Sequence, residues 1–188
     1  SFFAMGNPSF CLDYSREAWY NQSEIPMRII TKQTSEDGME LVNLNPFLRF
    51  MDRRICRYSY KTPICACDAR LFYLLEGEAR LLLENQTLIL KAGDGVFFPG
   101  GLPYQFFFDE ETPAEMFVLN FDPDCTRTAL PPQTPGPAEA FREQQPSCLS
   151  FPPPLDRPVS VFQAQSLEAP LARLLSEHEG RSPYRQAL

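Results

Sequence analysis

The chain has 188 residues, of which 44% are hydrophobic, 22% charged and 13% aromatic. This balance is that of a globular domain, and the length suits one core with an appendage. The formal net charge of −7 argues against nucleic-acid binding by this segment itself, because phosphates are bound by clustered Lys and Arg. No apolar stretch approaches the roughly 20 residues of a membrane-spanning helix, and no signal peptide is visible. We therefore expect a cytoplasmic protein without membrane contact.

Residues 1–46 are predicted to form an N-terminal arm and a first strand over 27–31. From Phe47 to Asp122, short runs rich in Phe, Leu, Ile and Tyr are interrupted by Gly, Pro, Asn and Asp. This rhythm is typical of an antiparallel sandwich or barrel, with expected strands at 70–75, 79–84, 87–91, 96–98, 104–108 and 116–121. Residues 47–122 are thus the predicted barrel core.

Residues 123–162 are rich in proline and show little apolar periodicity, which predicts an extended connector over the outside of the barrel. Residues 163–188 return to helical spacing, with Ser166 as the expected N-cap and Gly180 as the stop. A second helix is expected to begin at Ser182. The apolar stripe of the first helix consists of Leu167, Leu171, Leu174, Leu175 and His178.

The segment 93–104 reads GDGVFFPGGLPY. It resembles the second cupin motif, G-x5-P-x-G-x2-H, with Gly93, Pro99 and Gly101 in place and Tyr104 at the histidine position. The segment 67–78, CDARLFYLLEGE, resembles the run H-D-Y-E-L-I-Y-V-L-S-G-E of AraC-type sensor domains, with Cys67 for the histidine and Arg70 for the glutamate.

The resemblance implies a mainly β protein, a cupin-like jelly-roll β-barrel followed by C-terminal α-helices. It implies the ligand-sensing, homodimeric half of an AraC-type transcription regulator, whose effector is a small molecule, with sugars as the family-level expectation. DNA would be bound only by a helix-turn-helix domain that this sequence lacks, so the chain is expected to be trimmed before it. No enzymatic activity is expected.

Metal-dependent cupins bind their ion through histidines and a glutamate. Here Cys67, Arg70 and Tyr104 occupy the matching positions, and the only histidine, His178, lies in the predicted terminal helix. We therefore expect no metal and no cofactor. The six cysteines are irregularly spaced and expected to be reduced, and the pair Cys65 and Cys67 lacks the second ligand pair of a zinc site.

An effector is expected to contact side chains that share the inward face of the barrel strands. The predicted ligand-binding residues are Cys67, Arg70, Phe72, Tyr104, Phe106 and Asn120. Arg70 would offer its guanidinium to a carboxylate, phosphate or sugar hydroxyl; equally, it is a solvated or internally paired arginine. Tyr104 and the phenylalanines either contact the ligand or pack the core, and Asn120 either orients the ligand or faces water.

The cluster Arg53, Arg54 and Arg57 is interpreted as a solvated strand face rather than an anion site. The predicted dimerisation residues are Leu171, Leu174, Leu175 and His178, expected to pack partly on the barrel and partly on a partner subunit. Two alternatives remain open. A metal-independent cupin enzyme, such as a sugar isomerase or epimerase, would need a base inside the barrel, and a structural or storage cupin would have no pocket.

Overall fold

The computed structural model describes residues 45–84, 86–126, 134–144 and 146–180. The strand expected over 27–31 and the helix expected from Ser182 lie outside the described residues. No helix in the described part is long and apolar enough to cross a membrane.

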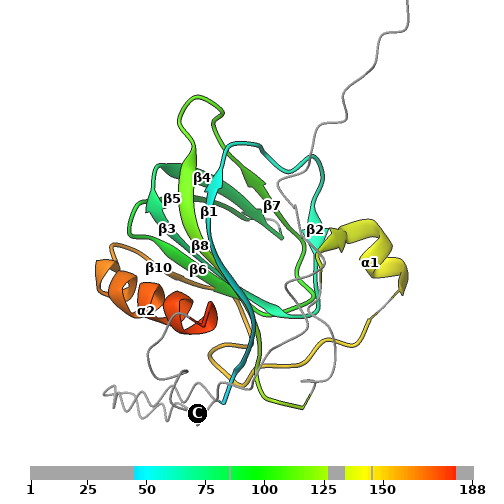
Figure 1. The fold of residues 1–188 in the computed structure, drawn as a ribbon. Helices are drawn as coiled ribbons and strands as arrows, with labels where there is room; N and C mark the ends of the chain where they lie inside the picture. The colour runs from blue at the N-terminus through cyan, green and yellow to red at the C-terminus, as the bar shows by residue number, and fades with distance from the viewer. Residues whose placement is uncertain (1–44, 85, 127–133, 145, 181–188) are drawn as a thin grey trace, which may run out of the picture.

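Two antiparallel sheets face each other and form the body of the molecule (Figure 1). The first has the order β1 (Phe47–Cys56), β8 (Ala114–Asp122), β3 (Ala69–Glu76), β6 (Gly95–Phe98) and β10 (Val159–Val161). The second has the order β5 (Gln86–Lys91), β4 (Glu78–Leu83), β7 (Tyr104–Phe107), β2 (Ile64–Cys65) and β9 (Gly136–Pro137). The predicted fold class, a mainly β cupin-like barrel with C-terminal helices, is confirmed.

Tight turns delimit the strands where the sequence predicted them. Gly77, between β3 and β4, has a φ of +79°, and Gly93, before β6, has a φ of +91°. A side chain at either position would be strained, because L-residues other than Gly rarely adopt such angles. The glycine pattern therefore fixes the ends of the hairpins.

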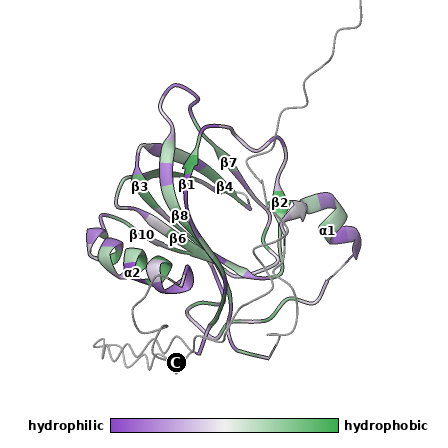
Figure 2. Cartoon of the chain, in the orientation of Figure 1, coloured by the Kyte–Doolittle hydropathy of each residue, from purple (hydrophilic) through white to green (hydrophobic). Residues whose placement is uncertain are grey.

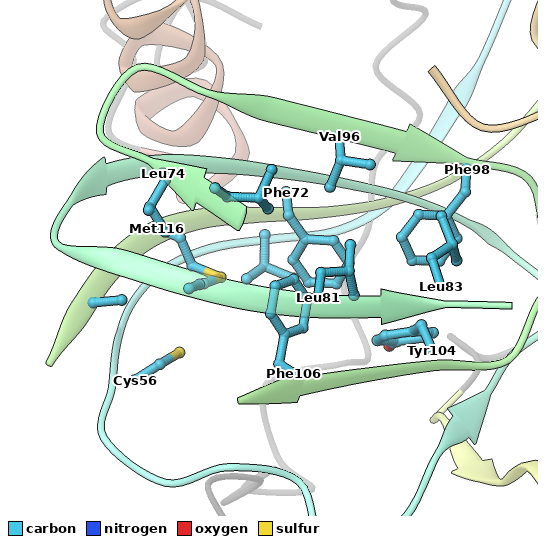
Figure 3. Close-up of a cluster of buried hydrophobic side chains, with 14 residues drawn as sticks. Cys56, Phe72, Leu74, Leu81, Leu83, Val96, Phe98, Tyr104, Phe106 and Met116 are labelled. Atoms are coloured by element: carbon cyan, nitrogen blue, oxygen red, sulfur yellow. The ribbon is translucent and has the colours of Figure 1, made fainter. Parts of the chain in front are cut away.

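Alternation along the strands separates an inner core from an outer one. On β3, Phe72 and Leu74 point between the sheets, where they pack with Val96, Phe98 and Phe106 (Figure 3). The intervening Tyr73 belongs to the outer cluster instead. Strands β3, β6 and β8 are buried on both faces, which explains why apolar residues dominate them (Figure 2).

The proline-rich connector is more ordered than its composition indicates. It contains β9, α1 (Ala138–Gln144) and β10, and so contributes an edge strand to each sheet. Backbone pairing of Val159 with Phe97 and of Val161 with Gly95 holds β10 against β6. The connector was predicted to cross the outside of the barrel, and its proline content gave no indication of these short strands.

The terminal helix α2 (Glu168–His178) follows a short 3-10 turn, η2 (Gln165–Leu167), and lies beside the first sheet (Figure 1). Ser166 is not its N-cap, because it lies within η2 and the capping position is Leu167, which makes no side-chain capping bond. Gly180 has a φ of +74° just beyond the helix, as expected of a C-terminal stop.

Candidate functional site

A small cavity lies inside the barrel between the two sheets. Its volume is about 30 Å³, and its walls include Arg70, Phe72, Tyr104, Met116 and Val118. This is room for about one water molecule, whereas sites for organic ligands usually measure about 300–1,000 Å³. Rings fill most of the interior: the Phe72 and Phe106 centroids are 4.8 Å apart, and those of Phe98 and Tyr104 are 5.0 Å apart.

Arg70 is anchored at the inner end of the cavity by an ion pair. Its Nη2 donates to Asp68 Oδ1 at 2.6 Å, and both side chains are almost inaccessible to solvent. Arg70 also faces Asn120 across the β3–β8 ladder. Within the described part of the chain, Asp68 Oδ2 and Asn120 Oδ1 are buried acceptors that receive no hydrogen bond. Polar groups therefore gather at one end of an otherwise apolar interior.

A second buried ion pair lies near the first. Arg49 Nε donates to Asp122 Oδ2 at 2.7 Å, and β1 and β8 supply the two residues. The β1–β8 register shifts between Leu48 and Phe50, so Arg49 is the extra residue of a bulge. Together the two pairs place four charged side chains at this end of the barrel, a group that we call the basal charge cluster.

The basal charge cluster alters the acidity of Asp68. Burial raises the pKa of Asp68 from 3.8 to about 6 by desolvation, and the attraction of Arg70 acts in the opposite direction without cancelling it. Asp122 adds to the rise and Arg49 opposes it, so the two ion pairs are within electrostatic reach of each other. A carboxyl group with such a pKa exchanges a proton near neutral pH.

Residues 57–63, the loop between β1 and β2, contribute Tyr58 and Tyr60 to the cavity wall. The Tyr60 ring lies edge-on against Tyr104, Phe106 and Phe108, with centroid distances of 6.3, 5.9 and 6.4 Å. Arg54 lines the cavity as well; it pairs with Asp52 at 2.8 Å and its guanidinium lies over the Phe50 ring. Two arginines, Arg54 and Arg70, therefore line the same cavity.

Several hydrogen bonds hold this loop to β7 and the residue that follows it, and Ser59 Oγ donates one of them to Phe108 O at 3.2 Å. Tyr60 N donates to Phe106 O at 2.9 Å, and Phe108 N donates to Ser59 Oγ at 2.9 Å. Gln105 Nε2 donates to Tyr60 O at 2.8 Å. Residues on either side of Tyr60 are exposed, including Tyr58 at 56%. The loop is thus held to the barrel by these hydrogen bonds and by the half-buried Tyr60 ring.

The structure places the predicted ligand-binding residues in three groups. Arg70, Phe72 and Tyr104 line the cavity. Phe106 is fully buried in the inner core, and Asn120 is buried beside Arg70, so neither Asn120 nor Arg70 faces water. Cys67 is buried but is not among the cavity-lining residues. Strand alternation thus predicted which residues share a face, while motif alignment alone selected Cys67.

Sequence reasoning missed Arg54, Tyr60 and Asp68. The basic cluster divides: Arg53 is exposed and pairs with Glu115 at 2.7 Å, Arg57 is exposed, and Arg54 points toward the cavity. Alternation along β1 would have separated Arg53 from Arg54, since neighbouring strand residues point to opposite faces. No comparable signal indicates Tyr60, because loop residues follow no period.

The predicted dimerisation stripe packs on the barrel. Leu171 is buried, and Leu174 and Leu175 pack on the same outer cluster, which includes Tyr73 and Phe117. Tyr73 donates its hydroxyl to Glu168 Oε1 at 3.0 Å and lies 3.2 Å from Ala164 O, which joins β3 to the start of α2. His178 is the last residue of α2 and is partly buried. Pairing with a partner subunit stays a prediction.

The interior does not fit a metal ion. Arg70 brings a positive charge to its inner end, and within the described ranges no three His, Cys, Asp or Glu side chains are grouped as metal ligands. No disulfide joins the described cysteines. Burial raises the pKa of Cys65 to about 11, which disfavours the thiolate that binds zinc.

A larger hollow, of about 510 Å³, lies outside the barrel near Lys91, Asp94, Phe162 and Gln165. Its carboxylate has structural partners: Asp94 Oδ2 accepts from Lys91 N at 2.9 Å, and Asp94 Oδ1 accepts from Gln163 N at 3.1 Å. These bonds tie the β5–β6 turn to the segment after β10. We therefore assign the hollow a structural origin and place the candidate site inside the barrel.

Residues 68–120 match the family model described as a cupin domain, so the fold and this match together define a protein that contains a cupin domain. The match covers β3 to most of β8, including Arg70, Tyr104 and Asn120. A comparison with curated proteins gives no significant match.

Several solved structures match part of this chain. A single-residue variant of oxalate decarboxylase from Bacillus subtilis is 20% identical, with a TM-score of 0.34, over 45% of this chain and 23% of that one. Procruciferin, an 11S globulin from Brassica napus, is 16% identical, with a TM-score of 0.38, over 48% and 26%. The coconut allergen cocosin is 16% identical, with a TM-score of 0.34, over 40% and 23%. The matched part is about a quarter of each protein's length.

Proposed function

We propose that the barrel binds a small organic effector without a metal ion, and that the domain is the sensing half of an AraC-type transcription regulator. In this proposal the domain is not an enzyme, it pairs with a second copy, and DNA is bound by a helix-turn-helix domain elsewhere in the protein. The observation that carries the proposal is the convergence of Arg54, Arg70, Tyr60 and Tyr104 on one apolar cavity. Apolar walls with a few directed polar groups are typical of small-molecule sites.

An effector requires the barrel to open, because the closed cavity holds about 30 Å³. The 57–63 loop is the element suited to move, since it is exposed around Tyr60 and contains no helix or strand. Binding would therefore select an open arrangement of this loop.

Strand β3 supports a regulatory role because it connects the cavity with α2. Phe72 lines the cavity, and the next residue, Tyr73, bonds the start of α2 on the opposite face. A shift of β3 that follows effector binding would change how α2 packs. In AraC-type regulators, to which the segment 67–78 is similar, helices after the barrel pair the subunits.

A thermal-shift screen of sugars, organic acids and aromatic metabolites tests the sensing proposal. We expect a saturable rise in Tm for one class, unaffected by a chelator. Val118→Phe, which fills the cavity from its wall, should abolish the rise, whereas the control Val161→Phe on exposed β10 should keep it. Absence of any saturable compound, or equal loss in both variants, would contradict the proposal.

The regulatory part has its own test. Two helix-turn-helix units encoded in frame with this domain, and dimers of the chain by analytical ultracentrifugation, are expected. A reading frame without them, or a monomer at all concentrations, would contradict this part while leaving effector binding intact.

A second candidate is a metal-independent isomerase or epimerase, in which Asp68, a buried carboxyl group with a raised pKa, would reach a substrate only after the barrel opens, because it does not line the closed cavity. A carboxylate that titrates near pH 6 has the acidity of a general base. The test is turnover: NMR of the bound compound over hours, with Asp68→Asn as the control. Conversion by the wild type alone would establish the enzyme, and an unchanged compound would exclude it for that ligand.

A further inference from the structure

The charge of the cavity wall indicates the chemical class of the ligand. Among the described residues, the lining contains two charged side chains, both arginines, and no carboxylate. The acidic partners, Asp52 and Asp68, are not lining residues, although each bonds one of the two guanidinium groups. The arginines are thereby held in place while their charge is presented to the cavity.

Tyr60 lines the same cavity as these two arginines. Burial raises the pKa of the Tyr60 phenol well above 10, with Tyr104 and Cys56 adding to the rise and Arg54 and Arg70 opposing it. Both guanidinium groups are therefore within electrostatic reach of the same phenol oxygen. The phenol ring itself packs edge-on with Tyr104, Phe106 and Phe108. An aromatic ring that carries an oxygen therefore lines the closed cavity together with two cationic side chains.

We propose that the effector is an aromatic monocarboxylate that takes the place of the Tyr60 side chain, with its carboxylate bound by Arg54 and Arg70. The inference rests on the proposed function and names the ligand class of that site. The ligand ring would inherit the edge contacts now made by Tyr60, and its carboxylate would receive the charge-assisted hydrogen bonds that arginine forms best. Tyr60 is then a plug whose departure opens the barrel.

Calorimetric titration with benzoate and phenylacetate, against the neutral amides benzamide and phenylacetamide, tests the charge requirement. The acids should bind at least about 10-fold more tightly than the amides, because hydrogen bonds between charged groups are worth about 1.5–3 kcal/mol. Equal affinity for acid and amide would overturn the inference.

Variants locate the site. Arg54→Gln should weaken benzoate binding about 10-fold or more. Its matched control is Arg53→Gln, since Arg53 is the preceding residue, is exposed and faces away from the cavity. Arg54 is the informative arginine because its side chain is 20% exposed and its loss is tolerable, whereas Arg70 supports the basal charge cluster. Equal effects of the two substitutions would overturn the inference.

The plug is tested separately. Tyr60→Ala should bind benzoate about 10-fold more tightly, because the cost of displacing the ring disappears. In the wild type, benzoate should accelerate hydrogen exchange of the amides of Tyr60 and Phe108, which bond Phe106 O and Ser59 Oγ in the closed loop. Weaker binding by Tyr60→Ala together with slower exchange would show that Tyr60 is part of the site rather than its plug, and would overturn this step.

The result distinguishes this inference from the proposed function. A neutral sugar that binds saturably, is lost in Val118→Phe and is insensitive to Arg54→Gln would overturn the carboxylate and leave effector binding standing. Failure of every compound class would overturn both.

Discussion

Replacing Asp68 with Asn asks whether the ion pair below the cavity adds stability at neutral pH or costs it. The carboxylate has no solvent exposure and accepts a bond from Arg70 at 2.6 Å. Desolvation is the largest influence on its pKa, which rises to about 6 despite the nearby guanidinium. Relative to the unfolded chain in water, the folded protein therefore disfavours the carboxylate and favours the neutral acid.

The rise in pKa sets the size of the effect. The interval from 3.8 to about 6, at about 1.4 kcal/mol per pH unit, is worth about 3 kcal/mol. Because the folded-state pKa lies above the unfolded one, this stability is fully present below about pH 4 and is lost as the pH rises to about 6. Asn resembles the neutral acid at every pH. The free energy of unfolding of Asp68→Asn, relative to the wild type, should therefore rise by about 2 kcal/mol between about pH 4 and pH 7, which is most of the full effect.

Urea unfolding of both proteins at the two pH values measures this difference. The control is Asp52→Asn, which removes a carboxylate that is 41% exposed and should cost less than about 1 kcal/mol, as exposed ion pairs do. Removing one partner of a buried pair commonly costs about 3–5 kcal/mol. If Asp68→Asn loses stability relative to the wild type as the pH rises, attraction to Arg70 outweighs desolvation and the reasoning is refuted.

Three further predictions concern packing and the docking of α2. Gly100→Ala should lower the free energy of unfolding by more than about 3 kcal/mol, because the new methyl group would lie 1.9 Å from Cys67 O. The control is Gly136→Ala, because the space around Gly136 is open. Equal urea midpoints for the two variants would contradict the predicted clash. Leu171→Ala should cost about 2 kcal/mol or more by leaving a cavity under α2, and a loss below about 0.5 kcal/mol would place the helix elsewhere. Tyr73→Phe should cost about 1 kcal/mol and accelerate hydrogen exchange in α2, since it removes the bond to Glu168; unchanged exchange would show that this bond does not hold the helix.

Local patterns carry most of the information about the barrel. Its predicted limits, Phe47 and Asp122, are the first residue of β1 and the last of β8. Gly77 and Gly93 marked the turns because their positive φ values leave little alternative to glycine. The period of two also predicted that Arg70 and Phe72 share one face of β3, while leaving open which face is the inner one. These inferences need only neighbouring residues.

The missed features depend on contacts between distant segments. Tyr60 reaches the cavity because its loop folds back onto β7, and the extra residue at Arg49 becomes visible only when β1 is paired with β8. Val159, which lies in the proline-rich segment predicted to be an extended connector, pairs with Phe97 of β6. Sequence periodicity carries no information about such pairings, so the loop closing the site could not be predicted.

The bulge at Arg49 affects how strictly β1 must keep its register with β8. Arg49 and Asp122 come from the opening and closing strands of the 47–122 segment, 73 positions apart. Deleting one residue at the bulge would direct the Arg49 guanidinium to the opposite face of the sheet. Asp122 would then be a buried carboxylate without its ion-pair partner. Apolar side chains tolerate such slippage far better than ions do. The ion pair between Arg49 and Asp122 therefore favours the native register of β1 and β8, because a shifted register would leave both charges buried and unpaired.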